Sequence, residues 1–115
     1  MTRDGFDAVC RALPAVTMVV QWGDSQVYKV GGKVFASLGV DSSWSVKCSE
    51  IAYAALTEAG VAHRAQYSQP GACWAGFDAL DSLPDEEAAA LIANAHRLIA
   101  AKLTRKARAE LGLTA

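Results

Sequence analysis

The sequence predicts an α+β protein, a two-layer sandwich in which a mostly antiparallel sheet carries helices on one face. The first observation is a pair of glycines, Gly31-Gly32, between two runs rich in β-branched residues, which is the pattern of a tight β-hairpin. The second is that short turns separate most of the apolar runs, and strands joined in this way pair antiparallel. The third is the helical spacing of apolar residues near the start, in the middle and near the end of the chain.

Length and composition narrow the class of protein. The 115 residues (12.1 kDa) fit one domain over residues 1–115, with a polar tail from about residue 105. Apolar residues at 52% against 20% charged exclude a disordered chain, and the formal net charge of −1 argues against a dedicated, high-affinity nucleic-acid binder. Charges at Arg3, Asp4 and Asp7 exclude a secretion signal, and no apolar run reaches the about 18 residues of a membrane helix. Three cysteines without a CxxC pair predict reduced thiols in the cytoplasm.

The first helix is expected over residues 3–13, with Thr2 as its N-cap and Pro14 directly after its end. Residues 16–22 are mostly apolar and β-branched, and they predict the first strand. A turn at residues 23–25 leads to the hairpin.

The hairpin strands are expected at residues 26–30 and 33–38, because a two-residue type I′ turn requires positive φ at both central positions, which Gly31-Gly32 supply. Residues 41–43 form a polar break, and residues 44–47 form another short strand.

The second helix is expected to begin after Ser49 and to end at Gly60. Residues 61–67 are expected to be extended. Residues 73–79 predict a further strand, in which Gly76 marks a bulge or a close approach of the backbone.

The last and longest helix is expected to start at Ser82 and Asp85, which stand at the spacing of a capping box. Its apolar stripe passes through Leu91 and Ile99 to about Leu103. The predicted order of elements is therefore α-β-β-β-β-α-β-β-α.

Sequence motifs for catalysis or metal binding are not found. Gly31-Gly32-Lys33 does not meet the pattern of a phosphate-binding loop, because Val27 and Val34 stand where a glycine and a Ser or Thr are required. His63 and His96 have no partner at ligand spacing, so a surface position and a packed position are expected. No catalytic residue, metal or cofactor is predicted, and an enzyme is only a third option because no acid–base pair is visible.

Two interpretations apply to Cys48, which lies between a strand and the start of a helix. The positive end of the helix dipole would lower the pKa of its thiol, whereas the lack of a nearby base favours a structural role. Cys10 and Cys73 are expected to serve packing.

The basic residues also have two interpretations. In the expected hairpin register Val30 pairs with Lys33 and Lys29 pairs with Val34, so the two lysines point to opposite faces. Together with Lys47 they either protect exposed strand edges or contact phosphates. Arg97, Arg105 and Arg108 fall on one side of the last helix, where they either complement the helix dipole or contact a nucleic acid or an acidic partner.

The order "ALP…WGDSQVYKVGGKVFASL…WSVK…GACWAGFDAL…LPDEEAAALIANAHRLIAAKL" resembles the MmcQ/YjbR family of small bacterial proteins over roughly residues 6–103. The resemblance implies a fold similar to CyaY and frataxin with a double-wing arrangement, a DNA-binding label and no known enzymatic activity. It makes the hairpin at 26–38 one wing and Lys29, Lys33 and Lys47 its phosphate contacts. Two departures are His96, where members tend to have Ser followed by an aromatic residue, and a chain that is not basic overall. Asp4 and Asp7 fall short of an acidic ridge for iron.

The sequence therefore predicts a cytoplasmic bacterial protein that binds DNA weakly through phosphate contacts. The alternative is a non-enzymatic adaptor that binds a protein or small ligand on the open sheet face. Trp44 is a stacking candidate if it is exposed, and a core residue otherwise. The nucleic-acid candidates are Lys29, Lys33, Lys47, Arg64, Arg97, Arg105 and Arg108.

Overall fold

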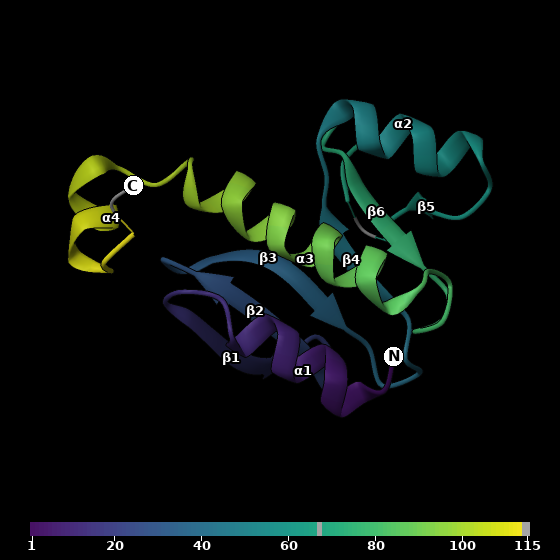
Figure 1. The fold of residues 1–115 in the computed structure, drawn as a ribbon, viewed down its shortest axis with the longest axis horizontal. Coiled ribbons are helices and arrows are strands. Elements are labelled where there is room, and N and C mark those ends of the chain that lie inside the picture. The colour runs from purple at the N-terminus through teal and green to yellow at the C-terminus, as the bar shows by residue number, and fades with distance from the viewer. Residues whose placement is uncertain (67, 114–115) are drawn as a thin grey trace.

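The computed structural model describes residues 1–66 and 68–113 and consists of one six-stranded sheet and four helices (Figure 1). Its elements in chain order are α1 (Arg3–Arg11), β1 (Val16–Gln21), β2 (Ser25–Val30), β3 (Lys33–Leu38), β4 (Trp44–Lys47), α2 (Glu50–Glu58), β5 (His63–Arg64), β6 (Trp74–Phe77), α3 (Asp85–Ala100) and α4 (Arg105–Glu110). The predicted order of elements is confirmed up to α3.

The sheet has the strand order β1-β2-β3-β4-β6-β5, and every pair of neighbouring strands is antiparallel. Helix α3 lies across β3 and β4, α1 packs beside α3 and against β1, and α2 packs against β6 and β5 (Figure 1). The predicted α+β fold with a mostly antiparallel sheet is confirmed. No helix among the described residues is long and apolar enough to cross a membrane.

The β2–β3 hairpin has the predicted turn and register. Gly31 and Gly32 have φ values of 58° and 78°, as a type I′ turn requires, and Val30 pairs with Lys33. A bulge that the sequence did not predict follows at Phe35, because Tyr28 pairs with Ala36 and the next residue of β2 pairs with Val34. The side chains of both Phe35 and Ala36 are thereby buried.

The ends of the helices follow the sequence in part. Thr2 and Ser49 cap α1 and α2 as predicted, each accepting a hydrogen bond from a backbone N–H of the first turn. The predicted capping box at Ser82 is wrong, since α3 begins after Pro84 without a side-chain cap. The Ser82 hydroxyl instead accepts a hydrogen bond from the Ala79 N–H at 3.2 Å and closes the preceding turn.

The last long helix ends before the predicted limit of its apolar stripe, about Leu103. Helix α3 ends at Ala100, and a separate α4 begins after Thr104, whose hydroxyl accepts a hydrogen bond from the Ala107 N–H at 3.0 Å. Leu103 lies in the turn between the two helices and packs into the core. Because Arg97 belongs to α3 and the other two arginines to α4, they do not share one helix face. The extended segment expected at 61–67 shortens to β5, and Tyr67 lies outside the described residues.

Candidate functional site

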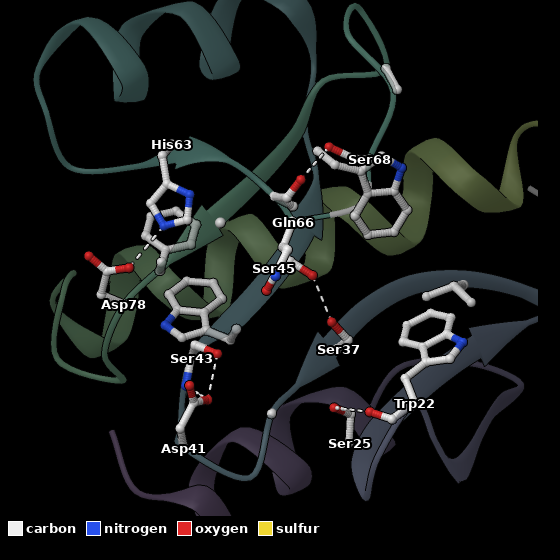
Figure 2. Close-up of a pocket in the computed structure, with 18 of the residues that line it drawn as sticks. Trp22, Ser25, Ser37, Asp41, Ser43, Ser45, His63, Gln66, Ser68 and Asp78 are labelled. Carbon is white, nitrogen blue, oxygen red and sulfur yellow. Dashed lines mark hydrogen bonds and ion pairs between the residues drawn. The ribbon is translucent and has the colours of Figure 1, made fainter.

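The sheet face opposite α1 and α3 carries an open cleft of about 1040 Å³. Its floor is formed by β3, β4 and β6, where Ser37 and Ser45 share a hydrogen bond of 2.6 Å between their hydroxyls. Figure 2 shows Trp22 at one end of this cleft and His63 with Asp78 at the other. The described lining contains no lysine or arginine.

The His63 end of the cleft is a small polar cluster. The ring of His63 lies between two oxygens, with Nδ1 2.9 Å from the Arg64 carbonyl oxygen and Nε2 2.9 Å from Asp78 Oδ1 (Figure 2). Only the doubly protonated ring donates a hydrogen bond to both oxygens, so both bonds favour the charged ring. They raise the pKa of His63, and the bond to the Arg64 carbonyl contributes more than the bond to Asp78. Nearby, the Ser43 hydroxyl and backbone N–H donate to Asp41 and lower the pKa of that carboxyl.

Gly76 makes room for this arrangement. A Cβ at Gly76 would lie 2.8 Å from His63 Cε1, and the φ of Gly76 lies outside the positive range that favours glycine. Of the two expectations for Gly76, the close approach holds and the bulge does not: the ring of His63 lies against it, and the backbone Cα of Ala65 would lie 3.1 Å from the same Cβ.

We expect Asp78→Asn to lower the pKa of His63 toward its ordinary value, because the mutation removes the carboxylate that favours the imidazolium. Folding stability contributed by this raised pKa is present below the ordinary pKa of histidine and is lost as pH rises through the folded value. An NMR titration of the ring protons measures the shift, and Asp41→Asn serves as the control. An unchanged pKa of His63 in Asp78→Asn would show that the carboxylate does not act on the ring.

A second feature is a basic end of the molecule, formed where the tip of the hairpin meets the end of α3. A Cβ at Gly31 would lie 2.6 Å from Leu103 Cδ1, so Leu103 rests directly on the turn of the hairpin. Figure 1 shows the hairpin turn, the end of α3 and α4 at the same end of the molecule. The basic end is defined here as Lys29, Lys33, Arg97, Lys102, Arg105, Lys106 and Arg108.

The basic end is rich in unpaired charge. It holds seven of the eleven lysines and arginines of the chain, and Glu110 is the acidic residue of α4. Among residues 1–66 and 68–113, none of these seven side chains forms an ion pair. The sequence missed this grouping because it depends on the contact between Gly31 and Leu103, which are far apart in the chain.

Two of the predicted basic residues lie elsewhere. The ammonium of Lys47 donates a hydrogen bond to the carbonyl oxygen of Ala72, so it ties β4 to the loop before β6. Arg64 is exposed on β5, four strands from β2 in the sheet and therefore roughly 19 Å from it at the usual strand spacing. Lys29, Lys33, Lys47 and Arg64 thus do not converge on one surface.

Trp44 is not available for stacking on a base. Its side chain is 3% exposed, its ring stacks on Phe77 with centroids 4.0 Å apart, and Phe6 packs against it edge-on. The indole N–H donates to the Ala79 carbonyl oxygen at 2.8 Å. The stacking candidate is therefore corrected to a core residue, which was the other expectation for Trp44.

The remaining candidates have structural positions. Burial raises the pKa of the Cys48 thiol to about 11, which favours the structural role over a thiol activated by the start of α2. His96 is buried and lies 2.8 Å from the Pro14 carbonyl oxygen through Nε2, as expected for a packed histidine. Within the described part of the chain, no three His, Cys, Asp or Glu side chains gather as metal ligands.

The fold and its surfaces define a small α+β protein with one helix-covered sheet face, one open face and one basic end. The YjbR family model matches residues 11–98, and the chain belongs to this family. The fold is similar to the crystal structure of Deinococcus radiodurans protein DR2400, a DUF419 domain, with a TM-score of 0.85 and 24% identity over 98% of this chain and 89% of that one. None of the curated proteins compared with the sequence matches it.

Proposed function

We propose that the protein binds DNA weakly through the basic end, in the bacterial cytoplasm. The observation that carries the proposal is the contact of Leu103 with Gly31, which places two hairpin lysines and the cations of α3 and α4 at one end of the molecule. Exposed lysines and arginines without carboxylate partners attract phosphates and release the counterions of DNA.

Phosphate contacts of this kind position a protein on DNA and carry little sequence information. The net charge of −1 is consistent with low affinity, because charges outside the basic end repel the polyanion. Lys33 on the hairpin and Arg105 on α4 are exposed and belong to different elements, so they represent the two halves of the proposed interface.

The test is the binding of a fluorescent duplex by anisotropy at about 50 mM salt. We expect Lys33→Gln with Arg105→Gln to weaken binding by roughly 10- to 100-fold, since each lost phosphate contact removes up to about tenfold at this salt concentration. Arg64→Gln is the matched control, because it removes one exposed charge far from the basic end. Equal losses in both variants would refute a localised interface.

The cleft on the open face supports the alternative of an adaptor, because its volume of about 1040 Å³ suits a ligand. Among the described residues, its lining carries Asp41, Asp78 and His63 but no lysine or arginine, which favours an uncharged or cationic ligand over a nucleic acid. Backbone NMR shifts during the DNA titration distinguish the two sites. Shifts at Lys33 and Arg105 support the basic end, and shifts confined to the cleft overturn it.

A further inference from the structure

The two edges of the sheet differ in how they are protected from pairing with another strand. At one edge, β5 has only two residues, His63 and Arg64, and both are polar and exposed. Short strands and charged side chains are the usual protection of a sheet edge. At the other edge, β1 (Val16–Gln21) has six residues and contains no charge, no proline and no glycine.

The outer side of β1 presents unpaired backbone groups. All six residues of β1 pair with β2 in unbroken register, and β1 has no other strand neighbour within the described part of the chain. In an antiparallel pair about half of the backbone N–H and C=O groups of an edge strand point away from its neighbour. Among the described residues, no further hydrogen bond reaches the backbone of residues 16–21.

Apolar side chains accompany this open edge. Val19, Val20 and Trp22 are 37%, 59% and 65% exposed, and they are three of the six exposed large hydrophobic residues of the described chain. Trp22 also holds a positive φ of 54°, a conformation that is unfavourable for a bulky residue. A long, apolar and unprotected edge strand is a template for strand addition.

We propose that the protein forms a homodimer in which β1 pairs antiparallel with β1 of a second copy. A second copy of the chain is the partner that this edge suits best. An edge strand is complementary to its own copy about a two-fold axis, and β1 has no charged residue that would select a different partner. The pairing joins two six-stranded sheets along their apolar edges. This inference is independent of the proposed DNA binding.

The symmetry limits the register of the pairing. A two-fold axis perpendicular to the sheet keeps each side chain on its own face, so paired residues differ by an even number of positions. A centre on Val19 places Met18 opposite Val20 and Thr17 opposite Gln21 of the second copy, and it brings the exposed end of β1, residues 19–21, into the pairing. The two copies of Val19 then face each other across the axis.

This geometry makes charge swapping at one position a direct test. Sedimentation equilibrium from micromolar to millimolar concentration is expected to show a dimer for the wild-type chain. Val19→Lys and Val19→Asp are each expected to sediment as monomers, because like charges then stand directly opposite each other. Their equimolar mixture is expected to restore the dimer through opposite charges.

Val40→Lys is the matched control, because Val40 is 64% exposed outside the edge strand and its substitution leaves β1 intact. We expect this variant to remain dimeric, and thermal melts establish that each variant is folded. A wild-type monomer at all concentrations, a dimeric Val19→Lys, or a mixture that stays monomeric would each overturn the proposal.

Discussion

Gly31→Ala is expected to destabilise the protein by roughly 2–5 kcal/mol. The positive φ of 58° costs an L-residue about 1–2 kcal/mol. The added methyl would lie 2.6 Å from Leu103 Cδ1. Overpacking of this kind costs about 1–3 kcal/mol more. Urea unfolding followed by circular dichroism measures the change in the free energy of unfolding.

Gly32→Ala provides the matched control for this prediction. Gly32 also has a positive φ, 78°, but a Cβ at this position would meet no atom within 4 Å. We therefore expect a loss of only about 1–2 kcal/mol, from the backbone strain alone. Equal losses in the two variants would contradict the close contact between the hairpin turn and Leu103, on which the basic end depends.

Trp44→Ala is expected to cost roughly 3–5 kcal/mol, because it empties the centre of an aromatic cluster in the core. Trp44 lies between Phe77 and Phe6, and its indole N–H is satisfied by the Ala79 carbonyl oxygen. The midpoint of urea unfolding at low protein concentration measures the loss.

Trp22→Ala is the control for the same substitution at an exposed position. The Trp22 side chain is 65% exposed, so we expect a change within about 1 kcal/mol. A loss of stability in Trp44→Ala as small as that in Trp22→Ala would contradict the assignment of Trp44 to the core.

Local features of the fold could be predicted from the sequence. The Gly31-Gly32 turn fixes the hairpin register through backbone geometry alone, and Thr2 and Ser49 cap helices through contacts within one turn. The break after Ala100 also had a local signal, since Thr104 is a favourable N-cap. The break was missed because Leu103 continues the apolar stripe of the helix. In the structure Leu103 packs into the core from the turn between α3 and α4.

The candidate sites depend on contacts between distant residues, which one sequence does not reveal. The ring of His63 lies over Gly76 and binds Asp78, although only the glycine gave a signal in the sequence. The contact of Leu103 with Gly31 likewise joins segments far apart in the chain. The sequence predicted five of the seven residues of the basic end but not their convergence.

The salt dependence of duplex DNA binding is the sharpest test of the proposed interface. For phosphate contacts at the basic end, log K falls linearly with log salt, and Lys33→Gln flattens the slope by about one unit. Arg64→Gln is predicted to leave the slope unchanged, because Arg64 lies on β5 away from the basic end. Absence of binding at about 50 mM salt, or a slope that Lys33→Gln does not alter, would contradict DNA binding through the basic end.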